Sequence, residues 1–387
     1  MDLNLSEEQE MLKTMARDFL EHEYPFETAK AMDASETGFS PEHWQKVVDM
    51  GWPGLGIPEK YGGTGGSFQD LGVLYEELGQ AAFLSPLFSS AVLCVSAILE
   101  GGTEEQKDEL LPAIVRGERI LALAFTEPDY GWTPDKVTLS ATPKDGGFLL
   151  NGTKLFVRDV GSANQILCVA RTEKGDKPED GITLFLVDKQ TPGLSTYTLT
   201  GEEFVWSHDY ELTFDSVEVP RSSVLGEVDG GWATLSPALD RSIPVLCAYM
   251  LGGYQKAYDL SIDYGRTRVQ FGVPIGTFAR VQDVAIDMVN GLDASRWTTY
   301  EALWKVDAGK PDIINATSLA KAVTSEEYYQ GCVKAHEIHA GTGVDSGYPL
   351  YLYTKLARTL YYYLGDPRYH KQRLGDLFKK GLIVWRE

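Results

Sequence analysis

The stretch "DYGRTRVQFGVPIGTFARVQD", residues 263–283, decides the fold expected for the C-terminal part of the chain. A helical pattern reaches Arg268, the residues FGVP at 271–274 interrupt it, and a new helix is predicted to start near Thr277. An arginine at a helix C-terminus, beside a helix N-terminus and an aromatic ring, suits a pyrophosphate joined to a ring that can stack. An arginine that only favours the end of a helix dipole explains the same pattern. Spacing alone does not decide between them.

Long amphipathic segments surround this interruption. The segments at about 234–267, 278–308, 313–340 and 350–364 repeat apolar residues with a period of 3.6 and contain few helix breakers. Long helices joined by short loops pack as an up-and-down bundle. The chain is therefore predicted to end in a four-helix bundle domain.

The middle of the chain has a different pattern. Residues 119–228 contain short β-branched or alternating runs, such as RILALAFTE and GITLFLVDK, with turn signals between them. Successive strands without intervening helices indicate an antiparallel β-barrel or sandwich. Residues 1–118 contain capped helical segments, two of which stop at Gly51 and Gly117. The sequence predicts an α+β protein with an N-terminal helical domain (1–118), a β-domain (119–228) and a C-terminal helical bundle domain (229–387).

Composition and charge narrow the possible functions. A net charge of −21, from 56 acidic and 35 basic residues, argues against nucleic acid or an anionic membrane as a partner. The four cysteines form no CxxC motif, which predicts neither a zinc site nor a disulfide framework and favours a reducing, cytoplasmic location. No apolar run reaches the roughly 18 residues of a membrane span. The first segment, with Ser6 and Gln9 at capping-box spacing, is typical of an amphipathic helix and not of a signal peptide.

Two further stretches contain candidate functional residues. In "LAFTEPDYGWTPD", residues 123–135, a predicted strand ends at Thr126, whose hydroxyl and neighbouring amides could bond a flat heteroaromatic ligand; an ordinary strand exit explains them equally. In "AHEIHAGTGVDSGYP", residues 335–349, glycines follow His336 and His339. No third metal ligand stands at supporting spacing, so no metal site is predicted.

Several motifs occur in a fixed order along the chain. They are GWPGLGIPEKYGGTGG (51–66), EELG (76–79), LAFTEP (123–128), NGTKLFV (151–157), RTRVQFGVPIGTFARVQ (266–282) and EIHAGTGV (337–344). Together they resemble the acyl-CoA dehydrogenase family over residues 3–376. The tail LYYYLGDPRYHK is similar to a bacterial branch that includes steroid and cyclic-acid degraders and heteromeric members.

The resemblance implies a reaction and an assembly. It implies FAD held between the subunits of a homotetramer, or of a heterotetramer with a homologous chain, and α,β-dehydrogenation of an acyl-CoA thioester. A carboxylate base removes the α-proton while the β-hydrogen leaves as hydride to the flavin, and the base needs a matched pKa. An electron-transfer flavoprotein or a similar acceptor would reoxidise the flavin.

The resemblance also assigns cofactor residues on the adenosine and pyrophosphate side. The positions that match are Arg268, Phe271 and Gln282, followed by Gly341 and Gly343 in the glycine-rich loop. Glu337 stands where relatives commonly have Gln, which replaces a neutral group by an anion. A carboxylate there would repel a pyrophosphate, although it could accept a hydrogen bond from a ribose hydroxyl.

The flavin side departs further from the family pattern. Phe125, Thr126 and Phe156 remain compatible with a flavin ring. Arg158 replaces the Thr or Ser that relatives offer near flavin N5, and Trp132 replaces a small hydroxyl residue near the expected flavin and substrate contacts.

The catalytic base is not evident at any family position. The usual position holds Leu364, an alternative position holds Ser242, and the position used in the bacterial branch holds Tyr249, which would also contact substrate. Tyrosine has an ordinary pKa near 10 and would need a strongly lowered pKa to act as a base. Asp240 and Asp345 are the remaining acidic candidates, although Asp345 also suits a turn.

Three functional hypotheses follow. The chain is an FAD-dependent dehydrogenase of a bulky or cyclic acyl-CoA with a non-standard base. Alternatively, it is a base-poor subunit of a heterotetrameric acyl-CoA dehydrogenase, or a flavin-dependent monooxygenase or oxidase on the same fold.

Overall fold

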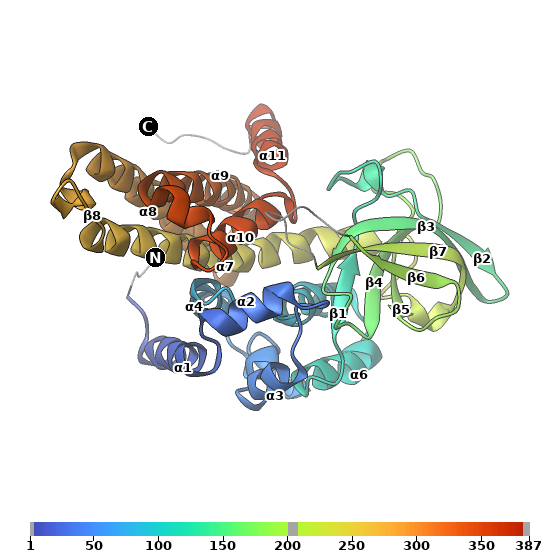
Figure 1. The fold of residues 1–387 in the computed structure, drawn as a ribbon. Coiled ribbons are helices and arrows are strands. Elements are labelled where there is room, and N and C mark those ends of the chain that lie inside the picture. Colours follow the sequence, from blue (N-terminus) through green and yellow to red (C-terminus); the bar gives the residue numbers. More distant parts are fainter. Residues whose placement is uncertain (1–3, 200–207, 382–387) are drawn as a thin grey trace.

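The computed structural model describes residues 4–199 and 208–381. Helices come first along the chain, a β-sheet second and longer helices last. Figure 1 shows the sheet, mainly in green, at one end of the molecule, with the N-terminal helices in blue and the C-terminal helices in yellow to red beside it. The predicted α+β fold with the order helical, β, helical is confirmed. The exact domain boundaries stay a prediction.

The N-terminal helices begin and end at short-range signals. Ser6 and Thr103 each start a helix with a capping box. Gly51 and Gly117 have left-handed φ angles of 75° and 69° just after α3 and α6, where a side chain would be disfavoured. The elements are α1 (Glu7–Glu23), α2 (Phe26–Ala34), α3 (Pro41–Asp49), η1 (Trp52–Gly54), η2 (Glu59–Tyr61), α4 (Phe68–Gln80), the π-helical segment η3 (Phe88–Cys94), α5 (Val95–Gly101) and α6 (Glu104–Val115).

The central sheet has seven strands in the described part of the chain and mixes directions. The elements are β1 (Leu121–Ala124), η4 (Pro134–Lys136), β2 (Ser140–Lys144), β3 (Gly147–Arg158), β4 (Gln165–Arg171), β5 (Ile182–Asp188), β6 (Leu194–Thr198), β7 (Asp209–Pro220) and η5 (Arg221–Ser223). The order is β1-β4-β2-β3-β7-β6, and β5 pairs with β4. The expected antiparallel pairing holds for β2–β3, β3–β7, β4–β5 and β6–β7, but β4 runs parallel to β1 and bridges β2 in parallel. Of the first four strands, β3 alone reverses direction, so the other three point the same way.

The C-terminal helices confirm the predicted bundle and add one helix. The elements are α7 (Gly231–Thr267), β8 (Val269–Gln270), β9 (Val273–Pro274), η6 (Ile275–Thr277), α8 (Ala279–Asp307), α9 (Ile313–His339), η7 (Ala340–Val344), α10 (Leu350–Tyr362) and α11 (Pro367–Lys379). The helix expected to reach residue 364 ends at Tyr362, because Leu364 and Gly365 take left-handed φ angles of 58° and 100°. The sequence did not predict α11.

Two glycines bring α4 and α7 into backbone contact. A Cβ atom at Gly79 would lie 1.9 Å from the carbonyl oxygen of Tyr249, and one at Gly252 would lie 1.9 Å from the carbonyl oxygen of Glu76. Only residues without a side chain permit this crossing. It places the partly buried Tyr249 between the N-terminal helices and the bundle. Within the described residues, no helix has both the length and the apolar character needed to cross a membrane.

Candidate active site and cofactor edge

The loop after β1 is anchored at both ends by one buried carboxylate. Glu127 pairs with Lys154 on β3 at 2.7 Å, and Lys154 Nζ also donates to the carbonyl of Phe125 at 3.0 Å. The backbone N–H groups of residues 138 and 139 donate to the same carboxylate at 3.0 Å. Burial opposes ionisation, but Lys154 and these donors together lower the pKa of Glu127. The segment from 128 to 137 is therefore held in place.

Trp132, in this segment, covers the residues that end the strand. Its indole stacks on the ring of Phe125, with the ring centres 5.2 Å apart and the planes at 1°. The rings of Tyr363 and Trp132 pack edge to face, with their centres 6.3 Å apart. The hydroxyl of Tyr369 donates to the Trp132 carbonyl at 3.2 Å. Phe125 and Thr126 are each only 3% exposed. A side chain of the chain itself thus covers the ring of Phe125, one of the predicted flavin contacts.

Arg158, at the end of β3, belongs to a charged cluster. Its guanidinium lies 5.1 Å from the centre of the Tyr363 ring. Burial disfavours the cation, but the carboxylates of Asp209 and Asp159 more than offset this and raise the pKa of Arg158. Asp159 accepts a hydrogen bond from the Ser89 hydroxyl. Burial raises the pKa of Asp209 to about 6, although Arg158 acts in the opposite direction.

Phe156 is the flavin-side residue that remains open. Its ring is 50% exposed, and its backbone has a left-handed φ of 54°. Tyr130 packs against it edge to face at 6.4 Å and donates a hydrogen bond to the carbonyl of Tyr362. Phe156 therefore presents an aromatic surface outside the covered face of Phe125.

No acidic side chain stands at the family base positions. Leu364 is buried, and its carbonyl accepts a hydrogen bond from His370 Nε2 at 3.0 Å. The buried Lys321 donates to the carbonyl of Leu360 at 3.0 Å and so holds the end of α10. The Ser242 hydroxyl donates within its own helix, to the carbonyl of Ala238 at 2.8 Å. Neither position offers a proton acceptor of suitable pKa.

Tyr249 does not meet the condition for a tyrosine base. Its hydroxyl donates to the carbonyl of Phe83 at 3.2 Å. Burial raises the pKa of Tyr249, and the nearby Arg158 lowers it by less than burial raises it. A phenol in this state stays protonated at neutral pH. The strongly lowered pKa that a tyrosine base would need is therefore not found at Tyr249.

The two acidic candidates have structural partners. Both carboxylate oxygens of Asp240 bond Arg373, at 2.5 and 2.7 Å, which joins α7 to α11. Asp345 accepts a hydrogen bond from the N–H of Gly347 at 2.8 Å, as a turn-forming aspartate does.

The hairpin β8–β9 forms an exposed edge at one end of the bundle (Figure 1). Arg268 caps α7 and is exposed, and the ring of Phe271 is 94% exposed. Gln282 Nε2 donates to the carbonyl of Gly276 at 2.9 Å, so the amide nitrogen of this predicted cofactor residue stabilises the loop before α8. A ring exposed to this extent is available to a neighbouring molecule.

The end of α9, just before the glycine-rich loop, carries a charge pair that the sequence did not suggest. Glu337 bonds Arg280 at 2.9 Å, so its charge is compensated from α8. A Cβ at Gly343 would meet His336 Nδ1 at 2.7 Å, whereas Gly341 borders open space. Gly341 therefore leaves room beside the loop, and the anion at 337 is less repulsive than the sequence implied.

The two histidines of the same region take part in protein contacts. His336 Nε2 lies 2.8 Å from the Thr354 hydroxyl, and His339 Nε2 lies 3.0 Å from the Tyr348 hydroxyl. Among the residues that the structure describes, no group of three or more His, Cys, Asp or Glu side chains could hold a metal ion.

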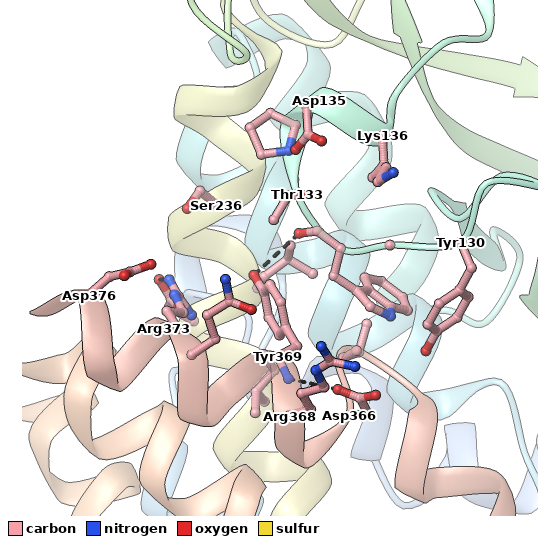
Figure 2. Close-up of a pocket in the computed structure, with 18 of the residues that line it drawn as sticks. Tyr130, Thr133, Asp135, Lys136, Ser236, Asp366, Arg368, Tyr369, Arg373 and Asp376 are labelled. Atoms are coloured by element: carbon pink, nitrogen blue, oxygen red, sulfur yellow. Dashed lines mark hydrogen bonds and ion pairs between the residues drawn. The ribbon is translucent and has the colours of Figure 1, made fainter.

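Two hollows lie beside Trp132 and Tyr363. The larger, a groove of about 870 Å³, lies between residues 130–136, the first turns of α7 and residues 364–376. In Figure 2, Tyr369 and Arg373 project from α11 toward the groove, on whose other side the loop carries Thr133. The smaller is an inner cavity of about 60 Å³ lined by Tyr249, Tyr363, Arg158 and Asp159. The outer groove can hold a substantial ligand, and the inner cavity cannot.

FAD fits one half of these residues and not the other. Its pyrophosphate and adenosine need an exposed cation and room beside a loop, which Arg268 and Gly341 offer. Its isoalloxazine ring needs a free flat surface, and Trp132 already stacks on Phe125, whereas Phe156 stays half exposed. The residues predicted for the pyrophosphate and adenosine are thus open, while the Phe125 face of the predicted ring site is covered.

Sequence reasoning missed several members of the site. Asp159 and Asp209 form the charge environment of Arg158, and Arg280 compensates Glu337. The acidic residues directly after Arg158 and His208 were the available signal. The pairing of Trp132 with Phe125 had none, because it depends on the path of the loop.

Comparisons with known proteins agree with this fold. The chain matches the acyl-CoA dehydrogenase N-terminal domain over residues 6–118, the middle domain over 122–217 and the C-terminal domain over 229–376. It is 33% identical over 377 residues to the acryloyl-CoA reductase (NADH) of Anaerotignum propionicum, covering 96% of this chain and 94% of that protein.

Two further similarities extend over nearly the whole chain. The caffeyl-CoA reductase–Etf complex subunit CarC of Acetobacterium woodii is 29% identical, with 97% of this chain and 99% of that protein covered. The solved structure of a steroid acyl-CoA dehydrogenase variant, Tcur3481–Tcur3483, has a TM-score of 0.85 and 31% identity, with 97% of this chain and 99% of that chain covered. The chain belongs to the acyl-CoA dehydrogenase family, whose members are oxidoreductases that act on the CH–CH bond of acyl-CoA thioesters.

Proposed function

We propose that this chain is a base-poor subunit of a heteromeric acyl-CoA dehydrogenase. FAD is the cofactor of the family. In the proposal, this chain contributes the edge formed by Arg268 and Phe271 to an FAD whose ring is held by a homologous partner chain. The partner also supplies the carboxylate that removes the α-proton.

The contrast between the two halves of the site carries this proposal. On the catalytic half, the family base positions hold Leu364, Ser242 and Tyr249, and Asp240 is committed to an ion pair. On the other half, Arg268 and Phe271 are exposed to a neighbour. If the base alone were missing, an enzyme with a different mechanism would explain it. Because the base is missing while Arg268 and Phe271 are still exposed, a subunit that helps to bind the FAD of a partner chain explains both observations better.

Expression of the chain alone and together with a homologous, glutamate-containing chain from the same organism tests the proposal. We expect the chain alone to contain less than one flavin per polypeptide by visible absorbance. The co-purified assembly should contain flavin that an acyl-CoA bleaches anaerobically. Arg268→Ala should lower the flavin content of the assembly, and Arg266→Ala, two residues earlier and also exposed, should not.

Two outcomes would replace the proposal by its alternatives. Stoichiometric flavin in the chain alone, bleached by an acyl-CoA, would identify an autonomous dehydrogenase. Consumption of NADH-reduced flavin with formation of an oxygenated product would identify a monooxygenase. Absence of any complex with the homologous chain, together with either result, would overturn the subunit assignment.

For the substrate and the electron acceptor, we propose a chemical class and a protein class. The groove of about 870 Å³ beside Leu364 is roomy enough for a bulky or cyclic acyl group, which we retain as the substrate class. An electron-transfer flavoprotein is retained as the acceptor, since one relative is a subunit of an Etf complex. Comparing cyclohexanecarboxyl-CoA with butyryl-CoA as bleaching agents of the assembly would distinguish cyclic from short linear substrates.

A further inference from the structure

We infer that Trp132 determines ligand specificity by filling a planar-ring site on Phe125, so that this chain excludes the isoalloxazine ring from its own half-site. The inference deepens the proposed function, on which it rests. It assigns one side chain as the cause of the difference between an open cofactor edge and a covered ring site. It also predicts that a flavin ring can enter when that side chain is made small.

The geometry of the two rings is that of a bound aromatic ligand. The planes are parallel within 1° and the centres lie 5.2 Å apart, inside the range of about 4.5–7 Å for offset-stacked rings. Tyr363 contacts the indole edge on, at 6.3 Å, and Trp232 lies 6.2 Å from Phe125 at a tilt of 42°. The indole therefore lies between the face of Phe125 and the ring of Tyr363, and Trp232 packs beside Phe125.

The indole is held there mainly by its loop. Trp132 is 8% exposed, and its buried Nε1 makes no hydrogen bond of good geometry within the described residues, although the indole acts to lower the pKa of the neighbouring Tyr130 hydroxyl, which burial raises. A buried donor without a partner costs free energy, so stacking and loop anchorage must outweigh that cost. The anchorage is the hydrogen bond from Tyr369 to the Trp132 carbonyl and the clamp of Glu127 on both ends of the loop.

The compartment opens toward usable space. Trp132, together with Trp232 and Leu364, lines the groove of about 870 Å³. Removal of the indole would join the face of Phe125 to this groove. A tricyclic ring could then stack on Phe125 while its remaining atoms extend into the groove.

Titration of the purified chain with lumiflavin tests the inference, because lumiflavin has the isoalloxazine ring without ribityl, phosphate or adenosine. Quenching of lumiflavin fluorescence should be negligible with the wild-type chain. Trp132→Ser should bind at least tenfold more tightly than wild type. Trp132→Phe retains a stacked ring and should resemble wild type, as should Trp297→Ala, which removes an exposed indole from α8.

Equal lumiflavin affinity of the wild-type chain and Trp132→Ser would overturn the inference, as would tight binding by wild type alone. If Trp132→Ser does not fold by circular dichroism, Trp132→Leu serves in its place, and the wild-type titration still decides whether the ring site is closed. The result is independent of the subunit assignment. Failure to co-purify with a homologous chain would overturn the proposed function but would not affect the lumiflavin comparison. Equal lumiflavin affinities would overturn the role of Trp132 but would not affect the subunit assignment.

Discussion

The guanidinium of Arg158 lies over the ring of Tyr363, 5.1 Å from its centre, and so joins the flavin side of the site to the residue before Leu364. Arg158 also compensates two carboxylates, Asp159 and Asp209, and burial raises the pKa of Asp209 to about 6. Arg158, Asp159 and Asp209 therefore influence one another's charge, and each can be tested by its own substitution.

Replacing Arg158 by Met should destabilise the chain most at neutral pH. The pKa values of Asp159 and Asp209 are already raised by burial, and loss of the cation raises them further. A raised folded-state pKa gives stability that is present at low pH and lost as pH rises through that pKa. We expect a loss of about 2–4 kcal/mol at pH 7.5 and a smaller loss at pH 4.5, by denaturant unfolding.

The exposed pair of Arg241 and Glu100 provides the matched control for Arg158→Met. Arg241→Met should cost less than about 1 kcal/mol, with little dependence on pH. A loss for Arg158→Met that is the same at pH 4.5 and 7.5 would contradict the role assigned to the two carboxylates.

Asp209→Asn should stabilise the chain at pH 7.5 relative to its effect at pH 4. Asp209 has a pKa of about 6 in the folded chain, raised from an ordinary value near 4 by burial. The folded state prefers the protonated form of Asp209, so the free energy of unfolding of the wild-type chain falls between pH 4 and 6. The variant does not show this fall, because Asn does not titrate. The free energy of unfolding of Asp209→Asn, minus that of wild type, should rise by about 1–3 kcal/mol from pH 4 to pH 6, as measured by thermal unfolding. Asp215→Asn, on the same strand, serves as a control with no expected change.

Lys321→Met should reveal the opposite kind of titration. Burial lowers the pKa of Lys321 to about 8, while an unfolded lysine titrates near 10.4. For a lowered lysine pKa, the unfolded state binds more protons between these values, so wild-type stability rises with pH from 8 toward 10.4. We expect the stability of wild type to improve relative to Lys321→Met by up to about 3 kcal/mol over this range. Lys371→Met, at an exposed ion pair with Glu326, should show no such trend.

The sequence predicts best those features that depend on neighbours along the chain. The capping box at Ser6 and the long helical periods are local, and the structure has them at the predicted places. The parallel pairing of β1 with β4 depends on contacts between residues more than 40 apart, such as Leu121 with Gln165, and was missed. Short-range patterns do not encode such pairings.

The candidate site follows the same division. Family motifs give the positions of Arg268, Trp132 and Leu364, and counting along the chain shows that no acid stands at the base positions. What those residues contact is set by tertiary structure. The ion pair of Asp240 with Arg373, 133 residues away, changes a possible base into a link between helices, and only the folded chain shows it.

Asp240→Asn separates a catalytic role for this residue from its role in the ion pair with Arg373. Removal of a general base typically lowers the rate by roughly 10²–10⁴-fold. We expect the flavin-containing assembly to keep its acyl-CoA oxidation rate within about threefold, because Asp240 is bonded through both carboxylate oxygens to Arg373. The melting temperature should fall, since the variant leaves Arg373 without its carboxylate. Asp376→Asn, also on the groove but paired with the exposed Lys379, should change neither quantity. A loss of activity beyond a hundredfold without a fall in melting temperature would instead identify Asp240 as the base.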